Sequence, residues 1–169
     1  MTEGQGAFDD LLAGNARFAA SFDHAGLTTR AARGLALVTC MDSRIAPLAL
    51  LGLEPGDAKI LRNAGARVTE DVLRTLVLAV YLLGVSRVLV MPHTDCKMAS
   101  ATEDEMHALI DAEYGLDTRS LEFRTVKDQV AALEQDLVRI RSYPLLPRDL
   151  PVGGGIYDVA TGILRPIDI

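Results

Sequence analysis

The sequence has no tryptophan, few aromatic residues (5%) and only two cysteines, Cys40 and Cys96, in 169 residues. A scaffold held together by several disulfides is therefore excluded, because small secreted domains of that kind are rich in cysteine. Two cysteines leave three alternatives, which are a single disulfide, two buried thiols, or two soft ligands of one metal ion.

Long apolar runs and an excess of basic residues are also missing. The longest uncharged apolar stretch, 75–85, is much shorter than the about 20 residues that cross a bilayer. Residues 1–10 carry acids and glycines, whereas a secretion signal begins with a basic segment and an apolar run. We therefore expect a cytoplasmic protein with no membrane partner, and in that reducing compartment a Cys40–Cys96 disulfide is disfavoured.

The charge balance argues against a nucleic-acid partner. Seventeen basic and 23 acidic side chains give a net charge of −6, which is the wrong sign for a general binder of nucleic acids or anionic membranes. With 49% hydrophobic and 24% charged residues, the chain has the composition of a folded globular protein. Its length suits a single domain over residues 1–169.

Short apolar runs alternate with longer amphipathic segments along the chain. The apolar runs predict strands at 35–39, 59–61 and 88–91, and residues 156–159 and 163–165 predict a terminal hairpin. The glycine run 153–155 before the hairpin is expected to be a loop. Helices are predicted at 8–22, 45–51, 69–83, 102–114 and 125–141. This alternation predicts an α/β fold with a mostly parallel sheet flanked by helices.

Polar residues follow three of the predicted strands directly. Cys40, Arg62 and His93 each stand at the carboxyl end of a strand, and ligands collect at that edge of parallel sheets. Cys96 follows His93 by three residues, so both cysteines are expected near the same edge. Arg62 fits either this site or an ion pair with an acid at the edge of the core.

Two cysteines and one histidine form a ligand set that zinc prefers. The remaining histidines, His24 and His107, stand in unrelated sequence contexts, so no fourth cysteine or histidine is expected. Cys40, His93 and Cys96 with one position open are typical of a catalytic zinc site, whereas a structural site normally has four protein ligands.

Asp42 and Arg44 stand two and four residues after Cys40. Because a guanidinium matches a carboxylate, we expect the two side chains to pair, which keeps Asp42 ionised and away from the metal. Asp42 could then accept a hydrogen bond from water at the open position, although a purely structural ion pair is the alternative. Asp95 is expected either to orient the loop or a ligand, or to lie exposed to solvent.

Three segments together resemble the signature segments of the β-class carbonic anhydrases, in the order and spacing of that family. They are residues 40–44 (CMDSR), 62–65 (RNAG) and 93–96 (HTDC). Residues 155–162 resemble the closing strand of the family, and the resemblance runs from about residue 7 to the C-terminus. It implies the family's α/β fold, with residues 1–33 as an N-terminal helical arm that packs on a partner subunit of a homodimer or dimer of dimers.

The resemblance also implies an activity, the reversible hydration of carbon dioxide to bicarbonate and a proton by zinc-bound hydroxide. The enzyme would be a zinc lyase with one Zn²⁺ per chain on the three ligands, and Asp42 and Arg44 would form the catalytic dyad. Zinc lowers the pKa of its bound water from 15.7 to about 7, which supplies hydroxide at neutral pH. The main chain at Ala64 and Gly65 is expected to bind the bicarbonate.

Lys97 departs from the family, which usually has glycine directly after the second cysteine ligand. A lysine at this position would change the shape or the charge of the pocket. Two alternative functions therefore stay open. One is hydrolysis of carbon disulfide or carbonyl sulfide on the same zinc site, and the other is a zinc-binding module without catalytic activity.

Overall fold

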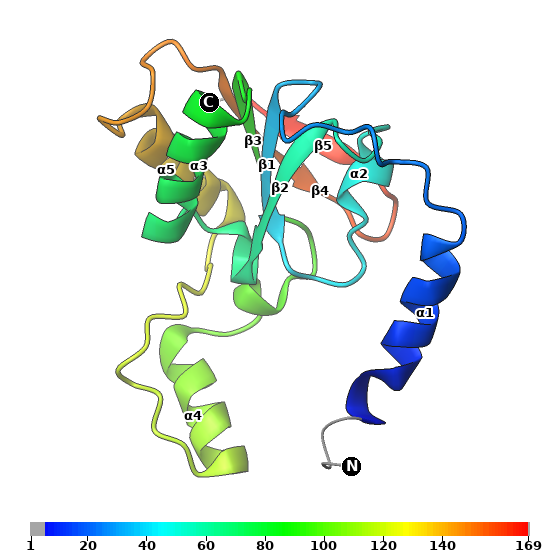
Figure 1. Ribbon diagram of the computed structural model, residues 1–169. Coiled ribbons are helices and arrows are strands. Elements are labelled where there is room, and N and C mark those ends of the chain that lie inside the picture. The colour runs from blue at the N-terminus through cyan, green and yellow to red at the C-terminus, as the bar shows by residue number, and fades with distance from the viewer. Residues whose placement is uncertain (1–5, 169) are drawn as a thin grey trace.

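The computed structural model describes residues 6–168, so that residues 1–5 of the predicted arm and residue 169 lie outside the described residues (Figure 1). Five strands form one sheet in the order β2-β1-β3-β4-β5. They are β1 (Leu35–Cys40), β2 (Ala58–Asn63), β3 (Arg87–Met91), β4 (Val152–Tyr157) and β5 (Leu164–Ile167). The first four are parallel and β5 runs antiparallel to β4, which confirms the predicted mostly parallel α/β sheet.

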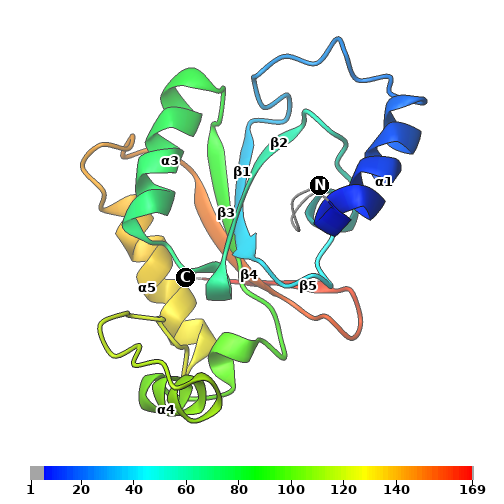
Figure 2. The same cartoon turned by 60° about the horizontal axis from the view of Figure 1, so that its bottom comes forward.

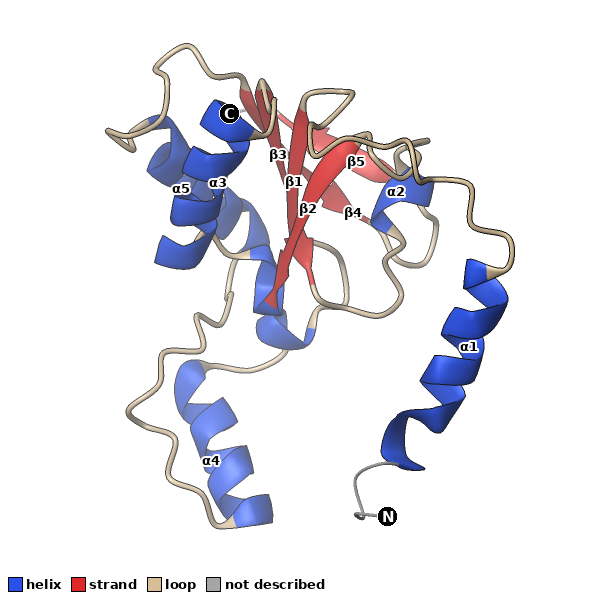
Figure 3. Ribbon diagram, in the orientation of Figure 1, coloured by secondary structure: helices blue, strands red, loops and turns tan. Residues whose placement is uncertain are grey.

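Two long helices cover one face of this sheet. They are α3 (Glu70–Leu82) and α5 (Gln129–Arg141), and the short helix α2 (Pro47–Leu50) lies on the other side (Figure 3). Helices α1 (Asp9–Ala19) and α4 (Glu103–Tyr114) extend away from the sheet (Figure 2). Three single turns complete the helical elements, η1 (Gly6–Phe8), η2 (Ala64–Ala66) and η3 (Lys97–Ala99). None of the helices within residues 6–168 is long and apolar enough to cross a membrane.

Apolar side chains fill the space on both faces of the sheet. Every residue of β1 is buried, as expected for a strand with a neighbour on each side and cover on each face. The larger core lies between the sheet, α3 and α5. A smaller cluster on the α2 side contains Cys40 and Cys96 together with Leu37, Ile45 and Met91, so both thiols belong to the core.

Two helix starts follow from side chains that cap free backbone N–H groups. Thr69 accepts a hydrogen bond from the N–H of Val72 at the start of α3. Thr102 and Glu105 form a reciprocal capping box at the start of α4. The starts predicted for these two helices are therefore confirmed.

The predicted start of the fifth helix at residue 125 is wrong by four residues. Helix α5 begins at Gln129, where Asp128 caps the first turn by accepting hydrogen bonds from two backbone N–H groups. Thr125 instead donates its backbone N–H and its hydroxyl to the carboxylate of Glu103. Arg124 has a φ of 60°, which is incompatible with a right-handed helix.

The glycine run 153–155 lies in a strand and not in the predicted loop. These residues belong to β4, which pairs with β3 on one side and β5 on the other. A Cβ atom on Gly154 would come within 3.0 Å of the side chains of Leu133 and Leu137. Glycine is therefore what allows α5 to pack directly on the backbone of β4.

The carboxyl ends of β1, β2 and β3 lie level with one another. In the register of the sheet, Cys40 stands beside Asn63, and Thr39 stands beside Met91. Beyond β3, His93 forms an isolated parallel bridge with Tyr157 of β4. Residues that are far apart in the sequence therefore meet at one edge of the sheet.

Helix α1 has no buried residue. The large apolar side chains of α1, Leu11, Leu12 and Phe18, are all exposed in the single chain, between 56% for Phe18 and 64% for Leu12. The helix thus presents an apolar surface that no described part of its own chain covers.

The burial of two leucines in α3 predicts that replacing them by alanine will destabilise the protein to different extents. Leu76 is fully buried, whereas Leu82 is 64% exposed. We expect Leu76→Ala to lower the free energy of unfolding by about 2–5 kcal/mol, because the substitution removes buried apolar contacts and leaves a cavity. Leu82→Ala on the same helix is the matched control and is expected to cost less than about 1 kcal/mol. Urea denaturation followed by circular dichroism measures both, and equal losses would contradict this assignment of the core.

Candidate metal centre

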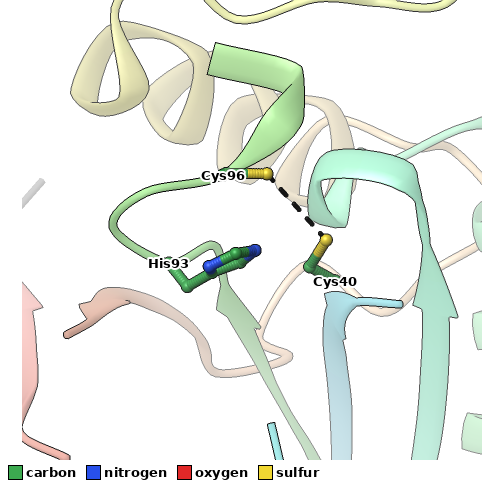
Figure 4. A group of neighbouring side chains, drawn as sticks. All are labelled: Cys40, His93 and Cys96. Carbon is green, nitrogen blue, oxygen red and sulfur yellow. Dashed lines mark hydrogen bonds between the residues drawn. The ribbon is translucent and has the colours of Figure 1, made fainter. Parts of the chain in front are cut away.

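Three potential metal ligands meet at the carboxyl edge of the sheet (Figure 4). Cys40 is the last residue of β1, His93 follows β3 by two residues, and Cys96 directly precedes η3. The two Sγ atoms are 4.0 Å apart. The ligand atoms of all three residues lie within 4.8 Å of one another, and all three residues are buried.

Hydrogen bonding decides which nitrogen of His93 faces the two sulfurs. Nδ1 lies 2.8 Å from the carbonyl oxygen of Thr94, so it carries the proton and donates. Nε2 therefore has a free lone pair, and it is buried without any hydrogen-bond partner within the described part of the chain. Leaving a buried polar atom unpaired costs about 1–3 kcal/mol. A cation between this nitrogen and the sulfurs would satisfy it, so the donor set fits a metal ion.

The two cysteines are free thiols, so the disulfide alternative is not realised. Burial raises the pKa of the Cys96 thiol to about 11. The Sγ atom of Cys40 accepts a hydrogen bond of 3.4 Å from the backbone N–H of Gly65. Cysteine binds metal ions as the thiolate.

The other two histidines lie outside this group, as their sequence contexts predict. His24 contacts Asp23, and His107 shares a hydrogen bond with Thr118. Within residues 6–168 the only group of three or more ligand side chains that fits a metal ion is formed by the two cysteines and His93.

The loop between His93 and Cys96 is held by contacts that the sequence did not reveal. Gln129, the first residue of α5, donates its side-chain N–H to the carbonyl oxygen of His93 at 2.7 Å. The backbone N–H of Thr94 donates to the carbonyl oxygen of Tyr157 at 2.9 Å. Gln129 stands in no recognisable motif, so only the packing of α5 against the sheet identifies it.

Asp42 and Arg44 form the predicted pair beside the ligand group. Arg44 donates its Nε to Oδ1 of Asp42 at 3.0 Å and its Nη2 to Oδ2 at 2.8 Å. Its backbone N–H adds a third bond, to Oδ1 at 2.9 Å. These hydrogen bonds hold the pKa of the Asp42 carboxyl well below its usual range. Oδ2 also lies 3.8 Å from Nε2 of His93, so an ionised carboxylate stands next to the ligands.

Asp95 connects this pair to the second ligand loop. Arg44 donates Nη1 to the Asp95 carboxylate at 2.7 Å and Nη2 to the Asp95 carbonyl oxygen at 2.9 Å. The side chain of Asp95 is 80% exposed, so it lies at the surface and also orients the loop. Its φ of 53° is uncommon for a residue other than glycine and marks the turn that delivers Cys96.

Arg62 forms no ion pair with an acid in residues 6–168, so the alternative of an acid partner is wrong. Its guanidinium donates to three main-chain carbonyl groups, that of Cys40 at the end of β1 and those of Asp42 and Ile45 in the loop that follows. Arg62 therefore belongs to the surroundings of the site.

Ala64 and Gly65 form the turn η2 next to Cys40. Gly65 has a φ of 78°, and a Cβ atom there would lie 3.2 Å from Met98, so both the turn and the space require glycine. Binding of bicarbonate by Ala64 and Gly65 remains a prediction. The side chain of Lys97 is exposed, and its φ is not positive, so its backbone does not need glycine.

Comparisons with a family model, with curated proteins and with solved structures all find carbonic anhydrases. The model of the family described as carbonic anhydrase matches residues 35–164. The chain is 36% identical over 160 residues to beta-carbonic anhydrase 1 of Mycobacterium tuberculosis, covering 94% of this chain and 96% of that protein. It is 30% identical over 153 residues to the carbon disulfide hydrolase of Acidithiobacillus thiooxidans, covering 79% and 77%. The crystal structure of a carbonic anhydrase from Streptococcus mutans matches with a TM-score of 0.90 and 37% identity, over 95% of this chain and 97% of that chain.

The ligand group predicts how metal binding depends on pH. The raised pKa of Cys96, about 11, keeps this thiol protonated in the metal-free protein at neutral pH. A metal ion must displace that proton, so the apparent affinity for zinc should rise about tenfold per pH unit for each proton displaced. Competition with a chromophoric chelator between pH 6.5 and 8.5 measures this slope, and a flat profile would contradict binding through a thiolate.

The zinc content of the purified protein tests the ligand assignment, and it is measured by elemental analysis. We expect about one zinc per chain in the wild-type protein and in His107→Ala, and a loss of zinc in His93→Ala.

Proposed function

The chain belongs to the β-class carbonic anhydrase family, and on that premise we propose that it catalyses the reversible hydration of carbon dioxide to bicarbonate and a proton. One observation carries the proposal, which is the meeting of three ligand residues with an ionised carboxylate at one buried edge of the sheet. We further propose that the metal is zinc, one ion per chain, held by Cys40, His93 and Cys96.

The chemistry of the donors supports zinc as the metal. Two thiols and one imidazole nitrogen are a ligand set that zinc takes in catalytic sites, and the described ligand group offers no fourth protein ligand. When bound, zinc lowers the pKa of water to about 7 and thereby supplies a nucleophile at neutral pH. The side chains of the protein have to orient that nucleophile toward the substrate.

Asp42 is suited to direct the attacking water. Arg44 occupies its carboxylate with three hydrogen bonds, so Asp42 stays ionised and can only accept hydrogen bonds. The carboxylate faces Nε2 of His93, and an O–H group in the space beside the ligands can therefore donate to it. The bidentate contact with Arg44 also restrains Asp42 from becoming a further metal ligand.

Hydrolysis of carbon disulfide is the second candidate, because relatives of that activity share 30–31% identity with the chain. The chain spans 76–77% of the length of those hydrolases, against 96% of beta-carbonic anhydrase 1. This fuller match supports carbon dioxide as the substrate that we propose. In the sequence, the inactive-module alternative gains weight from Lys97, but the exposed side chain of this residue in the structure gives it no support.

We propose that the working unit is a homodimer of single-domain subunits with residues 1–33 as the arm. Helix α1 exposes its apolar side chains, and a second copy of the chain would cover them. A cytoplasmic location fits the two free thiols, because that compartment keeps cysteines reduced.

Stopped-flow hydration of carbon dioxide tests the activity. We expect zinc-loaded protein to accelerate the reaction and Asp42→Asn to lower kcat at least tenfold, because the substitution removes the carboxylate that directs the water. Asp117→Asn is the matched control, since Arg119 holds Asp117 through the same three donor groups two residues further along the chain. No acceleration by the wild-type protein would refute the proposal. Sulfide release from carbon disulfide without carbon dioxide hydration would favour the second candidate.

The dimer is tested by a charge placed on the arm. Leu12 in α1 is 64% exposed and Leu145 after α5 is 58% exposed in the single chain. We expect Leu12→Asp to weaken the dimer at least tenfold, because burial of an unpaired charge opposes association. Leu145→Asp should leave the dimer intact. Sedimentation velocity over a range of concentrations distinguishes the variants, and an unchanged dimer in both would show that the arm is not the interface.

A further inference from the structure

The guanidinium of Arg62 binds three main-chain carbonyl groups, one at the end of β1 and two in the loop between β1 and α2. Its Nε donates to the carbonyl oxygen of Cys40 at 2.9 Å, and its Nη2 donates to that of Asp42 at 2.6 Å. Its Nη1 reaches the carbonyl oxygen of Ile45 at 3.3 Å. One side chain from β2 therefore organises residues 40–45, which include a proposed metal ligand and the proposed dyad.

These contacts replace sheet pairing at the point where it ends. The last hydrogen bond between the two strands in this region is donated by the N–H of Met41 to the carbonyl oxygen of Asn63. Strand β1 ends at Cys40, so the carbonyl groups of Asp42 and Ile45 lie beyond the strand and that of Cys40 lies at its end. A guanidinium carries five N–H donors in one plane, so a single arginine side chain can serve these three carbonyl oxygens at fixed relative positions.

Arg62 also differs from the nearby arginines in its charge environment. Arg44 pairs with Asp42 and Asp95, and Arg67 pairs with Asp136. No carboxylate within the described ranges lies in ion-pair distance of Arg62, and all its hydrogen bonds go to the main chain. Its charge thus polarises the carbonyl groups of the loop and strengthens these bonds.

Asp42 is consequently held from two directions. Arg62 binds its main-chain carbonyl, and Arg44 binds its carboxylate. With both contacts in place, Oδ2 of Asp42 stays 3.8 Å from Nε2 of His93. Without the contact from Arg62, the whole loop with its Asp42–Arg44 pair could shift as a unit relative to the ligands.

We propose that Arg62 is a positioning residue, whose planar guanidinium fixes the loop so that Cys40 remains among the ligands and Asp42 faces the space beside them. Its influence on turnover and on zinc binding rests on the proposed function, whereas its influence on the loop does not. Lysine at this position keeps the charge but loses the planar set of donors, so the two contributions are separable.

The test compares Arg62→Lys with Arg87→Lys. Arg87 is the matched control, because it also lies on a strand and donates to a main-chain carbonyl, that of Arg33, at the opposite end of the sheet. We expect Arg62→Lys to weaken zinc binding about 10–100-fold in chelator competition and to lower kcat at saturating zinc. Hydrogen exchange of the Arg44 and Ile45 amides should become faster in Arg62→Lys alone.

Arg62→Gln provides a second variant without charge. Wild-type zinc affinity and amide exchange in Arg62→Lys would overturn the proposal, whatever the result for Arg62→Gln, because the planar donors would then be dispensable. Should Arg62→Lys fail to fold, unchanged zinc affinity and exchange in Arg62→Gln would overturn it equally. If the wild-type protein binds zinc but hydrates no carbon dioxide, the proposed function fails, and the affinity and exchange measurements still decide the role of Arg62.

Discussion

The structure depends on one unfavourable contact, a buried imidazole nitrogen that faces two buried sulfurs without a hydrogen-bond partner in residues 6–168. A chain that folds only for stability would fill this space with apolar side chains. Here the surrounding contacts instead hold the unsatisfied atoms in place. Gln129 binds the carbonyl of His93, Gly65 donates to Cys40, and Arg44 joins the two loops. A cation bound between His93 and the two sulfurs would recover the free energy that the unpaired nitrogen costs.

Most of the fold was predictable from patterns within the sequence. The apolar runs of β1 and β3 and the capping residues Thr69 and Thr102 act over a few positions, so the sequence carries their signal directly. The start of α5 and the strand formed by the glycine run were not predictable in this way. Both depend on distant partners, Glu103 in one case and the leucines of α5 in the other.

The site shows the same division between local and distant information. The spacing of His93 and Cys96 and the closeness of Asp42 to Arg44 are visible in the sequence, because they lie within a few residues. The roles of Gln129 and Arg62 come from hydrogen bonds to main-chain carbonyl groups, which any residue type provides. A sequence motif cannot reveal such a contact, because one of its partners is a main-chain carbonyl group that every residue type carries.

The contact between Asp42 and Arg44 has a consequence for the order in which the centre is assembled. Asp117 and Arg119 form the same set of hydrogen bonds far from any metal ligand, so three consecutive residues are enough to build it. Folding alone therefore restrains the carboxylate of Asp42, and the entropy of ordering it is lost before any ligand binds. Binding of a metal ion beside this pair would then need no rearrangement of the Asp42–Arg44 contact.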